Sequence, residues 1–545
     1  MTSWGKLIKK GMRKLKKRMF KAALCLTLVF ALSAAAVARI ALSDAYKASA
    51  GVYSGYSVAV DRPRGTVFDR NLDPITNREE KYKAVLTATP EVTKELYRCF
   101  SAGEAEKIVE SLRENKPIAL YVPKDFSASG AAVFKIYDKT PAYIPAVQLI
   151  GYLDFEELHG KAGLEAIFDS RLICEKESTA AVSANAAGSP LLGVNPEKND
   201  LFEEYEKGII TTLDLRIQQA AEQALSGVKK GAVAVTKTSS GEILALCSTP
   251  SFSPKNLSAA LDNADSPFLN RGLLSYNLGS IFKICVAAAA LENGISPEEK
   301  YFCSGSVDCG NVFCCHKEDG HEEIDMSEAF AKSCNTYFIN LAEKVGAESI
   351  FDFAQKAGLS ADVVITEGLT AKSSLGQLSK IKESPAALAN FAIGQGDIAV
   401  SPLQVSLLVN AVANGGVYFP PFLVSGFKDK DGKTEYQKGT EGRRIMSKET
   451  AVTLSNMMTR VFEDGTAAAS RPKSGLYGGK TATAETGWKT ADGSAGKNAW
   501  FAGFYEFGGE KLSVAVLAEG GESGAADAVP VFKSLCDALS DASAD

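Results

Sequence analysis

The hydrophobic pattern of the chain opens with one long apolar run. Residues 22–38 contain no charged side chain, and three more apolar residues follow Arg39 and extend the run to Leu42. A membrane-spanning helix needs about 20 apolar residues, and an arginine near its end extends its side chain to the polar interface. The pattern predicts a transmembrane helix over residues 22–42, and no later apolar run is long enough for a second one.

Downstream of residue 206, the pattern predicts one sheet assembled from two distant parts of the chain. Residues 231–248 form two strands around a Ser-Ser-Gly turn, after a helix over residues 213–225. Three more strands and a final helix are predicted near the C-terminus, over residues 478–485, 498–507, 511–520 and 528–540. The residues between the two groups are mostly helical. We expect an α+β fold with an antiparallel five-stranded sheet, helices on both of its faces and a large helical insert.

The N-terminal half lacks a comparable catalytic pattern. Residues 43–60 are small and polar, as in a stalk, and a stretch near residues 177–200 predicts a loop or a hairpin at a domain edge. A chain of 545 residues is too long for one hydrophobic core. We expect a cytoplasmic basic segment, a transmembrane anchor, a non-catalytic pedestal or dimerisation-type domain and a catalytic domain, over residues 1–21, 22–42, 43–205 and 206–545.

Charge is distributed unevenly along the chain. The formal net charge is −5, yet the first 21 residues hold nine basic side chains and no acidic one. This distribution argues against nucleic acid as the main partner. Positive charge before an apolar run keeps the N-terminus in the cytoplasm and places the rest outside. The alternative is a cleaved signal peptide, because Ala36-Val37-Ala38 resembles a cleavage site, and either way the body of the protein is exported.

The most informative segment is an apolar helix predicted to start at Ser280 and to stop at Asn293-Gly294. Ser280 and Lys283 are three residues apart, so their side chains share one face of this helix. A serine at a helix start is usually only a cap. A lysine inside an otherwise apolar helix, however, loses solvation, and this lowers its pKa. Such a lysine takes a proton from a neighbouring hydroxyl and makes the serine a nucleophile.

Two further polar motifs join this pair to form a candidate site. Ser333-Cys334-Asn335 lies between two helical stretches, and Lys480-Thr481 lies on a predicted strand. Each motif alone is weak, because Ser-x-Asn occurs by chance in many chains and a strand lysine is often only an edge charge. The segment SGLYGGKT also resembles a phosphate-binding loop, but Ser474 replaces its first glycine.

Serine-x-x-lysine, serine-x-asparagine and lysine-threonine, in this order, resemble the signature of penicillin-binding proteins and serine β-lactamases. Three flanking segments resemble the same family. The approach to its nucleophile is similar to LNRGLLSYNLGSIFK, and its G-Q-G loop with the following helix is similar to FAIGQGDIAVSPLQVSLLVNAVANGG, which starts at Phe391. The strand after its lysine strand is similar to NAWFAGFYE, which starts at Asn498. RPRGTVFDRN from Arg62 and HGKAGLEAIFD from His159 resemble the class B, high-molecular-weight branch, whose pedestal is not catalytic. No glycosyltransferase signature accompanies them, so a bifunctional enzyme is not expected.

The resemblance implies a peptidoglycan D,D-transpeptidase that needs no metal or organic cofactor. Ser280 would attack the penultimate D-Ala carbonyl of a stem peptide and release the terminal D-Ala, with Lys283 as general base. Ser333 would relay a proton to the leaving amine, and Asn335 would bind the substrate and hold Lys283. An amine of a neighbouring stem peptide would then take the acyl group and form a cross-link. β-Lactams would acylate Ser280 in the same way.

The late strand is expected to bind the end of the substrate. By resemblance, Lys480 adds positive potential, Thr481 binds the terminal carboxylate, and the backbone N–H groups of Ser280 and Thr483 form the oxyanion hole. One departure lies on this strand, because Ala482 stands where the family usually has glycine. We expect an active enzyme, because the alanine adds only a methyl group. The alternatives are that this methyl group narrows the site or displaces Thr483 from the oxyanion hole.

Two other functions stay open on the sequence alone. A β-lactamase or β-lactam sensor of the same fold shares the acylation step and differs in what deacylates the serine. A catalytically inactive wall-synthesis scaffold would act through residues 43–205. By family analogy, the expected protein partners at the cell membrane are a polytopic glycosyltransferase and other wall-synthesis proteins. Elongation, division and sporulation all use this architecture, so the cellular role is not distinguished.

Four of the eleven cysteines crowd into thirteen residues next to two histidines: Cys303, Cys309, Cys314, Cys315, His316 and His321. Export favours a disulfide between Cys303 and either Cys314 or Cys315. Free thiols are the second alternative. The third is a zinc site, although its spacing fits no strong zinc pattern, drawn from Cys303, Cys309, Cys314 and His316. We assign no metal from the sequence.

Overall fold

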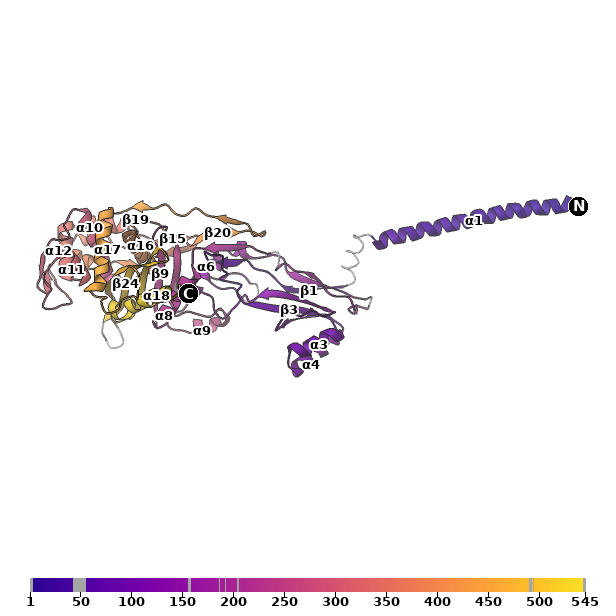
Figure 1. The fold of residues 1–545 in the computed structure, drawn as a ribbon, viewed down its shortest axis with the longest axis horizontal. Helices are drawn as coiled ribbons and strands as arrows, with labels where there is room; N and C mark the ends of the chain where they lie inside the picture. Colours follow the sequence, from indigo (N-terminus) through magenta and orange to yellow (C-terminus); the bar gives the residue numbers. More distant parts are fainter. Residues whose placement is uncertain are drawn as a thin grey trace. The chain divides into compact units, whose positions relative to one another are not determined.

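The computed structural model describes residues 3–42, 55–154, 158–185, 187–191, 193–202, 205–489, 493 and 495–542, and Figure 1 labels some of its elements. The chain divides into two compact units that alternate along the sequence. The first unit is made of Met1–Pro63, Glu80–Ile136 and Glu175–Glu203. The second is made of Arg64–Glu79, Tyr137–Cys174 and Glu204–Asp545.

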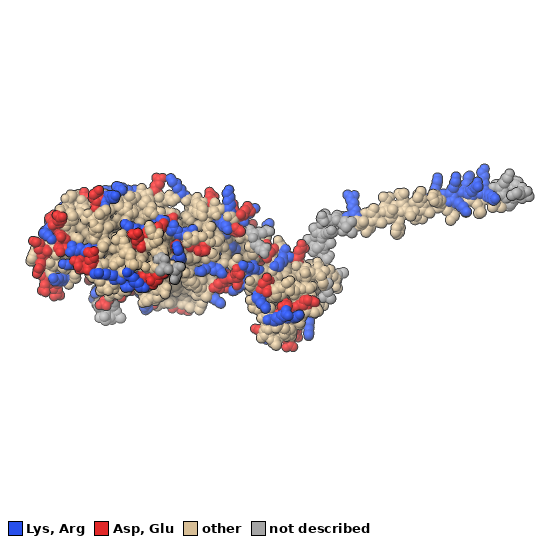
Figure 2. Space-filling view, in the orientation of Figure 1, with Lys and Arg blue, Asp and Glu red and all other residues tan. Residues whose placement is uncertain are grey.

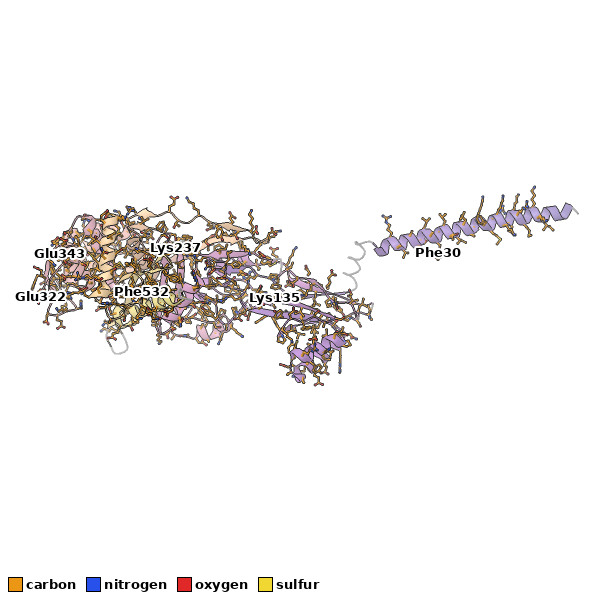
Figure 3. The ribbon with its side chains drawn as sticks, viewed as in Figure 1. Phe30, Lys135, Lys237, Glu322, Glu343 and Phe532 are labelled. Carbon is orange, nitrogen blue, oxygen red and sulfur yellow. The ribbon has the colours of Figure 1, made fainter. Side chains whose placement is uncertain are left out.

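The predicted anchor is part of one long helix, α1 (Ser3–Leu42). Its lysines and arginines gather toward the N-terminal end, and the stretch that follows is uncharged (Figure 2). Phe30, labelled in Figure 3, is 80% exposed on this helix. Ile8–Arg39 is the one helical stretch among the described residues that is long and apolar enough to cross a membrane. An unburied apolar helix of this length is typical of a membrane anchor. The helix starts earlier than predicted, within the basic segment.

The first unit contains two three-stranded sheets, with strand orders β1-β6-β7 and β4-β3-β5. Its strands are β1 (Gly55–Asp61), β3 (Glu80–Leu86), β4 (Ile118–Val122), β5 (Ala131–Tyr137), β6 (Ser178–Ser183) and β7 (Glu197–Asn199). Helices α3 (Pro90–Cys99) and α4 (Ala102–Leu112) place Val92, Leu96 and Leu112 in one core with Leu86 of β3. The pairing of β6 with β7 forms the hairpin expected near residues 177–200.

The second unit is built on the predicted five-stranded antiparallel sheet, whose order is β10-β9-β25-β24-β23. Two early strands therefore lie beside three late ones. The strands are β9 (Gly231–Lys237), β10 (Ile243–Thr249), β23 (Tyr477–Lys489), β24 (Ala495–Phe507) and β25 (Glu510–Glu519). Strand β23 forms one edge of the sheet. SGLYGGKT therefore runs into an edge strand instead of a loop before a helix, and this excludes the phosphate-loop interpretation.

Helices cover both faces of this sheet, as expected. α8 (Leu215–Leu225) and α18 (Val529–Ala542) pack together on one face. There Phe532 of α18, labelled in Figure 3, contacts Phe501 of β24 with ring centroids 4.4 Å apart. α16 (Pro402–Ala413) covers the other face, and all twelve of its residues are buried. A helix that is apolar on every side needs such complete burial.

The remaining elements of the second unit are short, apart from the helices of the insert. Its other helices are α5 (Val147–Ile150), α6 (Gly163–Ile167), α7 (Asp169–Leu172), η1 (Pro254–Asn256), α9 (Leu257–Leu261), η2 (Gly279–Phe282), α10 (Lys283–Glu292), α11 (Met326–Ala331), α12 (Asn335–Val345), α13 (Ala347–Lys356), α14 (Leu378–Ile381), α15 (Pro385–Ala392), α17 (Lys448–Glu463) and η3 (Gly524–Ala528). Its other strands are β2 (Thr66–Phe68), β8 (Gly208–Thr211), β11 (Tyr301–Cys303), β12 (Ser306–Asp308), β13 (Val312–Cys314), β14 (Glu322–Ile324), β15 (Val363–Thr366), β16 (Leu369–Ala371), β17 (Ser373–Ser374), β18 (Ala399–Val400), β19 (Val417–Tyr418), β20 (Val424–Lys428), β21 (Thr434–Tyr436) and β22 (Arg443–Arg444).

Two segments from the N-terminal half belong to the second unit. Strand β2 pairs in parallel with β8. Arg64 is buried and donates hydrogen bonds to Glu165 at 2.8 Å and to Asp169 at 2.8 Å. The two motifs RPRG and HGKAGLE, far apart in sequence, therefore meet through a buried ion pair. The two units are defined by their internal packing and not by function. The division into a pedestal and a catalytic domain at residue 205 therefore stays a prediction.

Candidate active site

Ser280 and Lys283 lie at the junction of two helical segments. The predicted α-helix does not begin at Ser280, because η2 is a 3₁₀ turn and α10 begins at Lys283. Side chains three residues apart eclipse one another in a 3₁₀ turn, so this turn aligns the two side chains more closely than an α-helix would. The backbone N–H of Lys283 donates to the carbonyl of Ser280. The predicted stop also holds, since Asn293 caps α10.

Two glycines, Gly279 and Gly394, allow the loop around Gln395 to pack closely against the turn that contains Ser280. Gly279 has a φ of +55° and Gly394 a φ of +73°, both in the left-handed region that favours glycine. The Gly279 N–H donates to the Gly394 carbonyl at 3.0 Å. A Cβ at Gly394 would lie 2.0 Å from the Gly279 carbonyl oxygen. Both glycines are therefore required for the position of Ser280.

Lys283 is fully buried, as the apolar helix predicted. Its Nζ donates to the Ser333 carbonyl and to Asn335 Oδ1, each at 2.8 Å, and lies 3.3 Å from Ser333 Oγ. Burial lowers the pKa of Lys283 from 10.5 to about 8. A neutral amine has two N–H groups, and the two short bonds use both of them. The lone pair is then left for a hydroxyl proton.

Ser333 and Asn335 reach Lys283 from the turn between α11 and α12. Ser333 has a φ of +54°, which is uncommon for a residue other than glycine and often marks a functional site. α11 begins with a capping box formed by Asp325 and Glu328, as their spacing indicates. The Asn335 amide also donates to the Cys314 carbonyl at 3.1 Å. The turn is therefore fixed on both sides of Cys334.

Lys480 and Thr481 occupy the edge strand β23, but Lys480 is not an exposed edge charge. Its side chain is 0% exposed, and its Nζ lies 5.7 Å from the centre of the Phe330 ring. Its Nζ donates to the Thr481 carbonyl at 3.0 Å. Burial, together with repulsion from Lys283, lowers the pKa of Lys480 well below its ordinary value. The Thr481 hydroxyl bonds to that of Thr466 at 2.5 Å.

Ala482 and Thr483 follow on the same strand, where η3 approaches it closely. A Cβ at Gly524 would lie 2.6 Å from the Ala482 carbonyl oxygen, so only glycine fits there. The Thr483 carbonyl lies close to Gly279, where a Cβ would come within 3.0 Å of it. Thr483 therefore stands beside the Ser280 turn, although Ala482 replaces the usual glycine.

One open pocket of about 340 Å³ collects most of the predicted residues. It is lined by Ser280, His316, Ser333, Asn335, Ile393, Gln395, Thr466, Thr481, Ala482, Thr483, Ser523, Gly524 and Ala525. Lys283 and Lys480 lie buried behind these residues. Thr466 and Ser523 also line the pocket, although neither belongs to a recognised sequence motif. Gln395 lies in the G-Q-G segment, which contributes to the family resemblance but gives this residue no specific role.

The cysteine-rich loop does not form the predicted disulfide. Cys303, Cys314 and Cys315 are all free thiols. Cys314 is exposed at the end of β13, whereas Cys303 and Cys315 are buried. Cys314 is the last residue of β13 and Cys315 follows the strand, so the two neighbours differ in exposure. The zinc set drawn from the sequence is also not assembled, as described below.

Comparisons with known proteins agree with this geometry. A family model described as the penicillin binding protein transpeptidase domain matches residues 231–537. Peptidoglycan D,D-transpeptidase PbpA of Mycobacterium tuberculosis H37Rv is 31% identical over 361 residues, which cover 60% of this chain and 71% of that protein. Stage V sporulation protein D of Bacillus subtilis is 28% identical over 364 residues, covering 64% of this chain and 54% of that protein.

A solved structure is also similar to this chain. It is penicillin-binding protein A from Mycobacterium tuberculosis as a ceftriaxone acyl-enzyme complex, with a TM-score of 0.61 and 26% identity. The match covers 75% of this chain and 93% of that one. The fold is that of a penicillin-binding transpeptidase. The chain belongs to the penicillin-binding protein transpeptidase family, in its class B branch.

Proposed function

We propose that this protein is a peptidoglycan D,D-transpeptidase that cross-links stem peptides through an acyl-enzyme on Ser280. The observation that carries the proposal is the buried Lys283 amine, which directly follows the 3₁₀ turn that contains Ser280 and is held by Ser333 and Asn335. The relatives named as D,D-transpeptidases and the similar acyl-enzyme structure support the same assignment.

In the acylation step, the Ser280 hydroxyl gives its proton to the neutral Lys283 amine while its oxygen attacks the penultimate D-Ala carbonyl. Asn335 and the Ser333 carbonyl accept hydrogen bonds from Lys283 and orient its lone pair. When the tetrahedral intermediate collapses, the amide bond breaks and the terminal D-Ala leaves. Ser333, with Oγ 3.3 Å from Lys283 Nζ, passes the proton to the departing amine.

The developing oxyanion is bound by the backbone N–H groups of Ser280 and Thr483. Their proximity follows from the contact between Gly279 and the Thr483 carbonyl. Each such donor typically contributes about 10²–10³ in rate. Thr481 binds the terminal carboxylate of the substrate. Lys480 has a lowered pKa in the free protein, and an arriving carboxylate favours its protonated form, which supplies the positive potential.

The acyl group is then transferred to an amine of a neighbouring stem peptide, which regenerates Ser280. In this proposal α1 is a single-pass anchor with a cytoplasmic N-terminus, because its basic residues precede the apolar stretch. The catalytic unit then faces the cell wall. A polytopic glycosyltransferase and other wall-synthesis proteins are the proposed partners of the pedestal, and β-lactams are the proposed inhibitors.

Turnover of a synthetic donor stem peptide with an amine acceptor tests this proposal. Full-length protein in detergent is expected to release D-Ala and to form the cross-linked product, and Ser280→Ala is expected to abolish both. Ser258→Ala, an exposed serine of α9, is the matched control and should retain full turnover. Rapid hydrolysis of penicillin without peptide turnover would indicate a β-lactamase. Folded protein that turns over neither substrate would indicate a scaffold.

A further inference from the structure

Three thiols and one imidazole converge behind the active-site pocket. They belong to Cys303 at the end of β11, Cys315 after β13, His321 before β14 and Cys334 between α11 and α12. Their sulfur and nitrogen atoms all lie within 4.8 Å of one another. The three cysteines are buried and His321 is half-buried. Of this set, only Cys303 was in the zinc set drawn from the sequence.

The separations within this cluster fit a tetrahedral metal site. His321 Nδ1 lies 3.6 Å from Cys303 Sγ and 3.5 Å from Cys315 Sγ, and the sulfurs of Cys315 and Cys334 are 3.9 Å apart. With metal–sulfur bonds of about 2.3 Å and metal–nitrogen bonds of about 2.0–2.1 Å, tetrahedral edges are roughly 3.5 Å (S–N) and 3.8 Å (S–S). A central ion therefore fits with only small side-chain adjustments.

Backbone geometry brings these ligands together. Gly305 and Gly320 have φ values of +97° and +79°. A Cβ at Gly320 would lie 2.0 Å from the Cys303 carbonyl oxygen, so the chain crosses itself too tightly for a side chain. This crossing places His321 next to Cys303. The β12–β13 hairpin then returns Cys315 to the same point, where its N–H donates to the Gly305 carbonyl at 2.7 Å.

A buried hydroxyl supports two of the sulfurs. Thr336, which is fully buried, has its Oγ1 3.1 Å from Cys303 Sγ and 3.4 Å from Cys334 Sγ. Hydrogen bonds of this kind orient metal ligands and tune their basicity. A disulfide between Cys315 and Cys334 would need a sulfur separation of about 2.05 Å and would leave the converging imidazole without a role.

We propose that Cys303, Cys315, His321 and Cys334 bind one structural Zn²⁺. Three soft thiolates and an imidazole in a closed tetrahedron are a typical structural zinc set. Binding replaces the water ligands of the hydrated ion with four protein ligands, and each coordinating thiol releases its proton to solvent. No electron is transferred. The ion fixes the cysteine-rich loop, which has little apolar core of its own.

The site also constrains the catalytic turn. Cys334 stands between Ser333 and Asn335, both of which bond to Lys283. Coordination of Cys334 therefore holds the Ser333 φ of +54° and the Asn335 side chain in place. This coupling is the part of the inference that rests on the proposed function. The zinc site itself rests on the ligand geometry alone.

Metal content tests the site directly. Full-length protein, purified in detergent with reductant and loaded with zinc, is expected to retain about one zinc per chain by mass spectrometry after desalting. Cys334→Ser and His321→Ala are expected to retain less than a tenth of this. Cys309→Ser and Cys314→Ser are the matched controls, because both lie in the same loop but outside the cluster, and they should keep the zinc.

Two further readouts separate a lost site from a misfolded variant. His321→Cys supplies a fourth thiol and is expected to restore zinc binding. Cobalt substitution should give the thiolate charge-transfer absorption of a tetrahedral sulfur site. Wild-type protein that holds no zinc, a Cys315–Cys334 disulfide in the reduced preparation, or equal loss in the control variants would each overturn the proposal.

Removal of zinc by a chelator tests the coupling separately. The rate of Ser280 acylation by a fluorescent penicillin is expected to fall by about 10–100-fold, since small displacements of positioning groups have effects of this size. Unchanged acylation would overturn the coupling and leave the zinc site standing. Absence of acylation in every form would contradict the proposed function, and the zinc content would still decide the site.

Discussion

The pH dependence of acylation tests the role of Lys283 most quantitatively. Only the neutral amine accepts the Ser280 proton, so the rate follows the fraction of Lys283 that is deprotonated. Burial lowers the pKa of this lysine from 10.5 to about 8. At pH 7 this shift raises the neutral fraction from roughly 3 in 10,000 to roughly one in ten, a gain of about 300-fold. The sign is fixed: activity rises as the pH increases toward 8.

The expected profile therefore has a slope and a plateau. The second-order rate constant for labelling by a fluorescent penicillin should rise about tenfold per pH unit below 8 and level off above it. The assay runs from pH 6 to 9.5 at constant ionic strength, with Ser258→Ala as the matched control. A flat profile below pH 8, or a rise that continues toward 10.5, would refute the assignment of a buried, neutral base.

Replacing the base gives a second estimate of its contribution. Lys283→Met keeps the length and burial of the side chain but has no proton acceptor. The acylation rate is expected to fall by about 10²–10⁴-fold, and its remaining pH dependence should lose the step near 8. Lys283→Met that labels at the wild-type rate would show that another group removes the Ser280 proton.

Three further changes test the parts of the structure that position the site. Glu165→Ala leaves the buried charge of Arg64 without its main partner and should lower the free energy of unfolding by about 3–5 kcal/mol in urea titrations; a loss below 1 kcal/mol would mean that water reaches Arg64. Gly394→Ala forces a Cβ against the Gly279 carbonyl and should reduce acylation at least tenfold, because a displacement of about 1 Å has effects of this size; an unchanged rate would show that the turn relaxes without cost. Ala482→Gly should change acylation by less than about threefold, corresponding to less than 1 kcal/mol, whereas a large gain would show that the methyl group obstructs the site.

Much of the fold was accessible from the sequence because its signals are local and strong. The two apolar strands around the Ser-Ser-Gly turn predicted part of the sheet, and the apolar helix at Lys283 predicted the buried lysine. The family resemblance joined three weak motifs into one site, and the pocket contains Ser280, Ser333 and Thr481 together. The 3₁₀ turn before Lys283 was not predicted, because the same residues fit an α-helix pattern equally well.

The remaining features depend on contacts that no local pattern encodes. Lys480 is buried on an edge strand because helix α11 covers it with Phe330, which lies 150 residues earlier. The cluster of three cysteines and His321 could not be predicted from the sequence for two reasons. Its fourth member, Cys334, is part of the Ser-x-Asn motif and lies outside the cysteine-rich loop. Two glycines with left-handed backbone conformation also determine which thiols come together. The return of residues 64–79 to the catalytic unit depends on the Arg64 ion pair, whose partners lie about a hundred residues away.

The most direct test of the central claim is peptide mass spectrometry of the full-length protein after treatment with penicillin. The account predicts one long-lived penicilloyl adduct, located on Ser280, that is absent from Ser280→Ala and present in Ser258→Ala. An adduct on another residue, or folded wild-type protein that forms no adduct and turns over no stem peptide, would contradict it.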